Sequence, residues 1–460
     1  MRIENDILGE LDLPDDALYG IHSLRAKDNF ALEYKTTNPR LIRAIVTVKK
    51  AAALTWAGIE KTVLNSEAGA KKFDAIAGAC DALLAESEDS QAFKSAFITD
   101  ALQGGAGTST NMNVNEVIAN LALRGLGEKE GSYRIIHPLD DVNRGQSTND
   151  VYPTALRIAA ILLLRDLSDS CAALQEALQK KENQYDGVKK LGRTELMDAV
   201  PVTLGAEFGA YAQAIARDRW RLYKVEERLR QVNMGGTAVG LPDSKDRERR
   251  ALHQRYQFRI IEKLRELTGI GLALSEYPMD ITQNNDVFVE VSGLLKALSV
   301  NLLKIAGDFR LMNSGPAGGI GELKLAPVQA GSTIMPGKVN PVIAEMTMQA
   351  AIKVQANDYG VCAAASRGEF ELNAFLPLIA DALLESLCLL DRTVFLFRTK
   401  CVETLSPNLE RCKTNLESAP YFAAAYAPLI GYDTVSRIIA ESSGCGADEI
   451  LEKLKNFRGN

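Results

Sequence analysis

The stretch VFVEVSGLLKALSVNLLKIAGDFRLM, residues 287–312, has the longest regular apolar pattern in the chain. Its apolar residues recur at steps of three and four, at Val287, Val291, Leu294, Leu298, Leu302, Ile305 and Phe309. This spacing predicts one long helix with a single face turned toward a core. The pattern stops at residues 313–316, where Asn-Ser-Gly-Pro is a combination that ends helices.

Similar helical patterns lie on both sides of this stretch. They cover residues 39–100, 114–123, 155–167, 201–230, 342–365 and 375–397, and two more helices are predicted after residue 399. Alternating strand patterns are scarce, and residues 19–30 show no strong period, so we expect that segment to be a strap over the body. The sequence therefore predicts an all-α fold built around a bundle of long helices.

Composition narrows the class of protein. The 460 residues suggest two or three structural units, and a net charge of −6 argues against a nucleic-acid binder. The mixed-charge run at residues 245–250 is interpreted as a solvated helix face. Seven scattered cysteines without CxxC spacing fit a reducing compartment, and three histidines do not suffice for a His-rich zinc site. With no signal peptide and no long apolar run, we expect a soluble, cytoplasmic protein that binds no membrane.

The sequence GSTIMPGKVNPVIAE, residues 331–345, places small hydroxyl side chains and one cation before a helix. Asn340 is a preferred N-cap residue, and Pro341 is a preferred first helical residue. The free N–H groups and the dipole of a helix start favour an anion, so we single out Ser332, Lys338 and Asn340. An ordinary helix-start turn is the structural alternative.

Three other places put hydroxyl or amide side chains at an expected helix start. They are Thr108 and Ser109 after a GGAG loop, Ser147 with Thr148 and Asn149, and Thr194. Each alone fits ordinary helix capping. Together they suggest a pocket for a small dianion, with Lys338 supplying the positive charge. Such a pocket suits removal of a proton next to a carboxylate, with the carbanion held as an aci-carboxylate by fixed donors. No phosphate-binding GxxxxGK[ST] motif competes with this interpretation.

Five blocks of the sequence resemble the aspartase/fumarase superfamily, in the right order and over nearly the whole chain. They are GAGTSTNMNVNEV, QSTNDVYPT, GRTELMDAVPVTLG, the segment SGLLKAL…SGPAGGIGE, and GSTIMPGKVNPVIAE, which is similar to the signature loop GSSxMPxKxNPxxxE. Within the superfamily, YGIHSLRAKDNF at residues 19–30 is closer to the aspartate ammonia-lyases than to the fumarases. The Val-Ile pair at residues 342–343 favours the same group.

The resemblance implies a fold and an assembly. It implies an N-terminal helical domain at residues 1–140, a central helix bundle at 141–397 and a small C-terminal helical domain at 398–460. It also implies a homotetramer whose active sites each draw residues from three subunits, with residues 318–337 as a lid and no organic cofactor or metal.

The resemblance also implies roles in converting L-aspartate to fumarate and ammonia. Ser332 would remove the β-proton. The β-carboxylate would be held by Thr108, with Ser109 beside it, and by Ser147, Thr148 and Thr333. The α-carboxylate would be held by Thr194, Lys338 and Asn340, and Asn149 would help to bind the amino group.

Several residues depart from the family pattern. Glu195 stands where fumarases and some aspartases have His and other aspartases have Gln, and it would pair with Glu345. We expect Glu195 to face the substrate ammonium, and the alternative is a carboxylate turned toward a structural cation. The family block HPNDH is HPLDD here, with Leu139 and Asp141 as the changed residues, which makes fumarase activity less expected.

Of two further departures, the one at residues 144–145 has no explanation in the sequence, whereas the one at Ala317 would alter how the lid is anchored. Arg144 and Gly145 replace the usual Met and Ser, and Ala317 replaces an Arg of the lid. These changes leave other functions open. One is a different fumarate-forming lyase, either a fumarate hydratase or an enzyme releasing a substituted amine. Another is an inactive structural homologue, although such proteins tend to lose the loop Ser or Lys, and Ser332 and Lys338 are both present.

Overall fold

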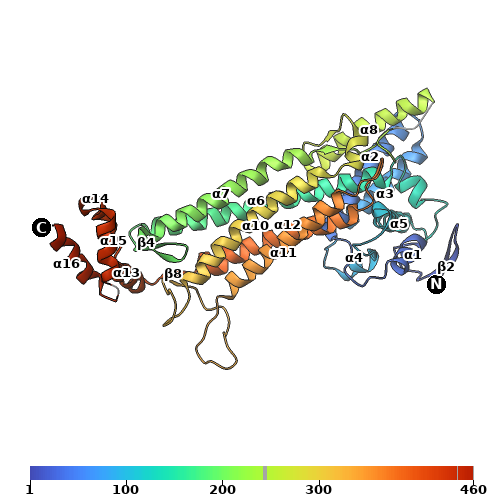
Figure 1. Ribbon diagram of the computed structural model, residues 1–460. Coiled ribbons are helices and arrows are strands. Elements are labelled where there is room, and N and C mark those ends of the chain that lie inside the picture. Colours follow the sequence, from blue (N-terminus) through green and yellow to red (C-terminus); the bar gives the residue numbers. More distant parts are fainter. Residues whose placement is uncertain (242–245, 443, 459–460) are drawn as a thin grey trace. The chain divides into compact units, whose positions relative to one another are not determined.

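The computed structural model describes residues 1–241, 246–442 and 444–458 (Figure 1). The chain divides into two compact units. Unit 1 contains Met1–Leu167, Arg221–Lys296 and Lys353–Leu389, and unit 2 contains Ser168–Trp220, Ala297–Ile352 and Leu390–Asn460. Each unit therefore gathers three separate segments of the sequence.

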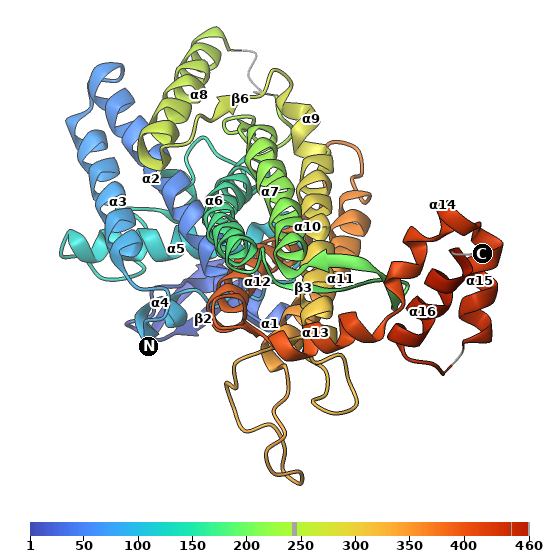
Figure 2. The same ribbon diagram turned by 90° about the vertical axis from the view of Figure 1, so that its left-hand side faces the viewer.

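Five long helices carry the fold, and by their residue bounds each has residues in both units. Figures 1 and 2 show these helices as long coiled ribbons. They are α6 (Thr148–Gln184), α7 (Leu204–Leu229), α10 (Asp286–Met312), α11 (Val342–Ala365) and α12 (Leu376–Phe397). The helix predicted at residues 287–312 is α10, and Val291, Leu298 and Phe309 on its predicted face are buried. In unit 2 the Phe309 ring lies 5.4 Å from that of Phe208 and 5.6 Å from that of Phe397. The all-α prediction is confirmed.

Unit 1 adds further helices, most of them from the first part of the chain. They are α2 (Pro39–Thr62), α3 (Glu67–Ala85), α4 (Gln91–Ala96), η1 (Gly105–Gly107), α5 (Thr108–Gly125), η2 (Pro138–Val142), α8 (Arg247–Thr268) and α9 (Pro278–Gln283). Two short parallel strands, β5 (Gln231–Val232) and β6 (Ala273–Leu274), pair beside α8. α2 begins as the sequence dictates, with Asn38 accepting from the Arg40 N–H and Pro39 in the first turn. Of the predicted charged run, Lys245 lies outside the described residues, and residues 246–250 are exposed at the start of α8.

The strap expected at residues 19–30 is wrong. After a hairpin of β1 (Arg2–Asp6) and β2 (Gly9–Leu13), the chain forms a helix, α1 (Ile21–Asn29). Its first N–H groups donate to buried carboxylates from other parts of the chain. Glu116 accepts from Gly20 and His22 at 2.9 Å, and Glu4 accepts from Ile21 at 2.8 Å. These distant acceptors stabilise the helix start, which the local apolar pattern does not indicate.

The region around Thr194 is also corrected. Thr194 does not precede a helix but ends β3 (Lys189–Thr194), which pairs antiparallel with β4 (Met197–Thr203). Glu195 and Leu196 form the two-residue turn with φ of 54° and 64°. Turns of this kind need φ > 0 at both positions and favour Asn-Gly, so Glu-Leu gave no hairpin signal. Gly192 is needed on β3, because a Cβ there would lie 2.6 Å from the Val200 carbonyl oxygen.

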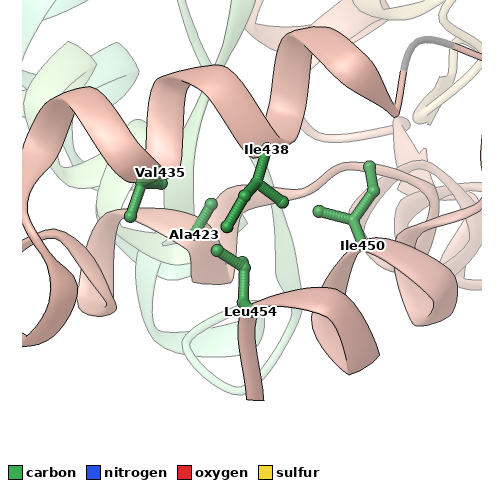
Figure 3. Packing of buried hydrophobic residues seen from close by; sticks show 5 residues of the cluster. All are labelled: Ala423, Val435, Ile438, Ile450 and Leu454. Carbon is green, nitrogen blue, oxygen red and sulfur yellow. The ribbon is translucent and has the colours of Figure 1, made fainter. Parts of the chain in front are cut away.

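The C-terminal segment has more helices than the two predicted. After η3 (Arg398–Val402) come α13 (Leu409–Ser418), η4 (Tyr421–Ala425), α14 (Ala427–Ile430), α15 (Tyr432–Glu441) and α16 (Ala447–Arg458), and β8 (Ser406–Pro407) pairs with β7 (Leu323–Lys324). Figure 3 shows the small core that the last helices share, formed by Ala423, Val435, Ile438, Ile450 and Leu454. The helices are short, and few apolar residues define each one, so the sequence pattern did not separate them.

The cysteines form no disulfide in the described residues, and their burial differs. Cys80, Cys171, Cys401 and Cys412 are buried free thiols, whereas Cys362 is exposed. In the part of the chain that the structure describes, no helix has the length and apolar character that crossing a membrane requires.

Candidate active site

The residues predicted for the site fall into two groups, one in each unit. Unit 1 holds Thr108, Ser109, Ser147, Thr148 and Asn149. Unit 2 holds Thr194, Glu195, Ser332, Thr333, Lys338, Asn340 and Glu345. Within unit 1 the structure joins two helix starts that are far apart in the sequence.

The start of α5 depends on a tight glycine turn. Gly107 has φ of 94°, and a Cβ there would lie 2.4 Å from the ring of Tyr152, so only glycine fits. The Thr108 hydroxyl donates to the Gly105 carbonyl at 2.7 Å, which fixes its side chain at the helix start. One turn on, Asn111 donates to the Thr148 hydroxyl oxygen at 3.2 Å. This contact brings the two predicted blocks together.

Residues 147–149, which we name the hydroxyl turn, begin α6. The Ser147 oxygen accepts from the Asn149 N–H at 3.2 Å. The Asn149 amide group donates to the Ala238 carbonyl at 2.8 Å, and Asn233 donates to the Asn149 carbonyl at 2.9 Å. The loop at residues 233–238 thus supports the hydroxyl turn.

Asp150 is a further residue that sequence analysis missed. Its carboxylate accepts from the N–H groups of Ser147 at 2.9 Å, Thr237 at 3.0 Å and Gly235 at 3.1 Å. Burial raises the pKa of Asp150 to about 7, although these donors and the nearby Lys49 oppose the rise. The residue therefore ties the hydroxyl turn to the loop at 233–238.

Lys49 of α2 is a fully buried amine below the same turn. Its Nζ lies 2.7 Å from Asn143 Oδ1 and 3.0 Å from Gln146 Oε1. Burial lowers the pKa of Lys49 to about 7, and the charge of Asp150 counteracts part of that effect. In the sequence, the one indication of this role was a lysine among the apolar residues of a predicted helix.

In unit 2, residues 331–340 form a loop that we name the serine loop. The Ser332 oxygen accepts from the Met335 N–H at 2.8 Å and from the Ile334 N–H at 3.2 Å. Two donors at one hydroxyl oxygen favour negative charge on it. The loop is otherwise open to solvent, with Ile334 83% exposed.

The base of the serine loop is closed by its own residues. The Asn340 amide group donates to the Gly331 carbonyl at 2.6 Å, and α11 begins two residues later at Val342. A Cβ on Gly331 would lie 2.0 Å from the Lys338 carbonyl oxygen. Lys338 itself is exposed. A helix does begin just after Asn340 and Pro341, but the predicted capping role is wrong, because the Asn340 side chain closes the loop instead of accepting from the first N–H groups of α11.

Glu195 and Glu345 line different pockets within unit 2. Glu345 lines a pocket of about 840 Å³ together with Lys338 and Asn340, and its carboxylate lies 3.6 Å from Arg310. Glu195 lines a pocket of about 430 Å³ that also contains Lys190, Arg193, Lys304, Glu207 and Asp308. The expected pairing of the two carboxylates stays a prediction.

A buried carboxylate fixes the base of the hairpin. Glu322 is fully buried and accepts from Arg193 at 2.9 and 3.0 Å, while Lys190 lies 3.1 Å away. Burial raises the pKa of Glu322, but hydrogen bonds from Arg193 and Asn415 and the charge of Lys190 together bring it below its ordinary value. The hairpin that carries Thr194 and Glu195 is thereby tied to the segment that leads into the serine loop.

The long helices carry two hydroxyl-bearing segments, the hydroxyl turn and the serine loop, and the comparisons with known proteins assign this fold to a family. Residues 9–356 match the family model described as "Lyase", and the chain belongs to this family within the aspartase/fumarase superfamily. The resemblance seen in the sequence is therefore confirmed.

Individual relatives agree with this assignment. The chain is 41% identical over 442 residues to "Aspartate ammonia-lyase" of Bacillus sp, covering 96% of this chain and 91% of that protein. The crystal structure of "fumarate lyase:delta crystallin" from Brucella melitensis in native form is 41% identical, with a TM-score of 0.88 over 98% of this chain and 99% of that chain. The class II fumarase of Schistosoma mansoni is 29% identical, with a TM-score of 0.89 over 99% and 95%.

Proposed function

We propose that this protein is an aspartate ammonia-lyase that converts L-aspartate to fumarate and ammonia. The observation that carries the proposal is Ser332, whose oxygen accepts two backbone N–H groups in a loop with the family signature. The similarity to the Bacillus sp enzyme named for this activity supports the same substrate.

The chemistry follows from the donors. Ser332, as the alkoxide, takes the β-proton of aspartate, and the electron pair of that C–H bond moves into the β-carboxylate to form an aci-carboxylate. Hydroxyls of Thr108, Ser147, Thr148 and Thr333 stabilise the added charge, because they are fixed before it develops. The electron pair then returns to form the double bond as the C–N bond breaks and ammonia leaves.

The other end of the substrate needs a cation and polar donors. Thr194, Lys338 and Asn340 would hold the α-carboxylate, and Lys338 supplies its positive charge. Asn149 would accept from the substrate amino group. The amide group of Asn149 already donates to Ala238, which turns its carbonyl oxygen in a defined direction. No organic cofactor enters these steps.

The proposal includes an assembly. The hydroxyl turn of one copy would meet the serine loop and the hairpin of other copies in a homotetramer, so that each site draws on three subunits. The three-domain division at residues 1–140, 141–397 and 398–460 accompanies this proposal, and the separate small core in the last helices supports its final boundary. Residues 318–337 would close as a lid over bound substrate. Free cysteines throughout suit a cytoplasmic location.

Glu195 is proposed to face the substrate ammonium and so to favour an amine over water as the leaving group. Its pocket also contains Lys190, Arg193 and Lys304, which gives weight to the alternative of a structural ion pair. Replacing Glu195 by Gln removes the charge and keeps the shape. Unchanged turnover of aspartate and unchanged selectivity for amines in that variant would rule out the proposed role.

A second candidate function is another fumarate-forming lyase. The strong structural likeness to a class II fumarase favours testing a hydratase, and Glu195 favours testing a lyase for substituted amines. Purified protein is mixed in turn with aspartate, malate and N-substituted aspartates, and the ultraviolet absorbance of the new double bond is followed. The proposal expects aspartate to give the highest kcat/KM. A higher value for malate or for a substituted aspartate would replace it, and an inactive wild type would indicate a structural homologue.

A further inference from the structure

We infer that Arg144 is a positioning residue for the hydroxyl turn, held in place by one face of α2. The inference rests on the proposed function, because it concerns the carboxylate that the hydroxyl turn would bind. Arg144 and Gly145 stand where the superfamily pattern has Met and Ser, so the device belongs to this chain rather than to the general pattern.

Arg144 makes three kinds of contact with α2 and its neighbour α3. Its Nη1 lies 2.7 Å from the Glu60 carboxylate, and its guanidinium carbon lies 4.3 Å from the centre of the Trp56 ring and 5.5 Å from that of Phe73. The Trp56 indole N–H donates back to the Arg144 carbonyl at 2.9 Å. Both the side chain and the backbone of Arg144 are therefore fixed by α2.

Gly145 completes this contact. It has φ of 70°, and a Cβ there would lie 3.1 Å from the Trp56 ring. A side chain at residue 145 would be strained and would press on the indole, which must stay close to bond the Arg144 carbonyl. The glycine at residue 145 thus leaves room for the Trp56 ring that holds Arg144.

The same face of α2 holds the other side of this segment. Lys49, Trp56 and Glu60 are seven and four residues apart, which places them on one helix face. Lys49 reaches Asn143 and Gln146, the residues that flank Arg144 and Gly145. Residues 143–146 are consequently held at three points by a single helix.

The segment at residues 143–146 is closed on itself, so it moves as a unit. The Asn143 amide group donates to the Gln146 carbonyl at 3.1 Å, and the Gln146 amide group donates to the Val142 carbonyl at 3.0 Å. Ser147 and Thr148 follow directly. A shift of Arg144 would therefore displace the hydroxyls that would stabilise the aci-carboxylate, and small displacements of such donors have large kinetic effects.

Unit 1 contains a second arginine–glutamate pair whose side chains are about as exposed as those of Arg144 and Glu60. Arg165 of α6 bonds Glu226 of α7 through two nitrogens at 2.9 Å. The side chains of this pair are 40% and 11% exposed, against 33% and 8% for Arg144 and Glu60. Arg230 also donates to Glu226, at 2.8 Å, so Arg165→Met leaves that carboxylate one arginine. This variant controls for the removal of a partly exposed arginine from unit 1, and only Arg144 joins the segment before the hydroxyl turn.

The experiment compares Arg144→Met with Arg165→Met in the full-length protein. It measures kcat and KM for aspartate, and the thermal midpoint with and without succinate, an unreactive ligand with the same carbon skeleton. Arg144→Met should lower kcat/KM roughly tenfold, mostly through kcat, because the displaced hydroxyls act on the transition state. It should also reduce the stabilisation by succinate. Arg165→Met should leave both unchanged, and Arg144→Lys should recover part of the loss through its charge toward Glu60.

The outcomes separate the inference from the proposed function. Equal kinetic loss in Arg144→Met and Arg165→Met, or no loss in Arg144→Met, overturns the inference and leaves the function standing. A wild type that does not convert aspartate, but whose stabilisation by succinate is lost only in Arg144→Met, overturns the function and keeps the inference. A wild type with neither turnover nor stabilisation by succinate overturns both.

Discussion

The hydroxyl turn and the serine loop carry the same kinds of side chain but are held in different ways. Thr148 in the turn is 9% exposed and bonded to α5, and the segment before it is held by α2. Ile334 and Met335 in the loop are 83% and 49% exposed, and the base of the loop is closed by the Asn340 side chain, which donates to the Gly331 carbonyl. One half of the proposed site is thus held by packed helices, whereas the other half is largely exposed, as the proposed lid closure requires.

The largest expected effect comes from the serine loop. Replacing Ser332 by Ala removes the proposed base, and kcat should fall roughly a thousandfold, since a positioned base contributes about that much. Stabilisation by succinate should persist, because the carboxylate-binding side chains remain. Steady-state kinetics and thermal unfolding measure the two effects, and a variant with more than about a tenth of wild-type kcat would exclude Ser332 as the base.

A pair of glycine variants tests the contrast directly. Gly331→Ala would press on the Lys338 carbonyl at the base of the loop, whereas Gly107→Ala would press on the buried ring of Tyr152. We expect both to lower kcat/KM about a hundredfold. Only Gly107→Ala should also lower the thermal midpoint, by several degrees, because its neighbours are packed. Similar midpoints in the two variants would show that the turn is no more rigidly held than the loop.

Replacing Lys49 tests how the hydroxyl turn is held by α2. Lys49→Met keeps the length of the side chain but removes the amine that donates to Asn143 and Gln146. An acceptor left without its donor lowers the free energy of unfolding by about 1–3 kcal/mol. We expect kcat/KM to fall roughly tenfold, as in Arg144→Met, because the same segment moves. Arg165→Met is again the control. Normal kinetics in a destabilised Lys49→Met protein would limit Lys49 to a structural role.

The smallest effect concerns the ion pairs between helices of unit 1. Burial raises the pKa of Glu385, but hydrogen bonds from Lys353, Asn357 and Lys35 outweigh it and lower the pKa to about 2. The folded protein therefore keeps this carboxylate charged at pH values where the unfolded chain binds a proton. The stabilisation is present above pH 4.5 and is lost as the pH falls from 4.5 toward 2.

Thermal midpoints of wild type and Glu385→Gln measure this contribution. The wild type should unfold about 1–2 °C higher near pH 6, since partly exposed pairs contribute little, and this advantage should shrink toward pH 3. Glu417→Gln, which changes an exposed pair with Lys413, should show no comparable dependence. A difference that grows on acidification would contradict the sign worked out for Glu385.

The sequence was sufficient to predict those helices whose local apolar pattern matches the structure. The apolar period of α10 and the helix start after Asn340 needed only neighbouring residues, and the family blocks led to the correct fold. The helix α1 and the β3–β4 hairpin depend on contacts that are distant in the sequence, namely Glu116 for the first and Glu322 for the second. Such tertiary contacts override local propensity.

The supports of the site were harder to foresee than its hydroxyls. Ser147 and Thr148 were found because hydroxyls before a helix form a recognisable motif. Lys49 contacts Asn143 and Gln146, which are 94 and 97 positions away, and Arg144 contacts Glu60, which is 84 positions away. The sequence alone did not indicate that one face of α2 pairs with the segment at residues 143–146. That pairing is a property of the packed unit, and no spacing rule expresses it.

We propose that the hydroxyl turn of one copy and the serine loop of another copy make one active site. Two inactive variants, Thr148→Val and Ser332→Ala, are co-expressed or unfolded and refolded together. If the site is shared, mixed oligomers regain up to about a quarter of wild-type activity, because that fraction of sites receives both intact residues. A mixture of the Ser332→Ala and Lys338→Met variants should regain no activity. Both changes lie in the serine loop, so no copy in the mixture supplies an intact loop. Activity no higher than the sum of the two parents in the first mixture would contradict the account.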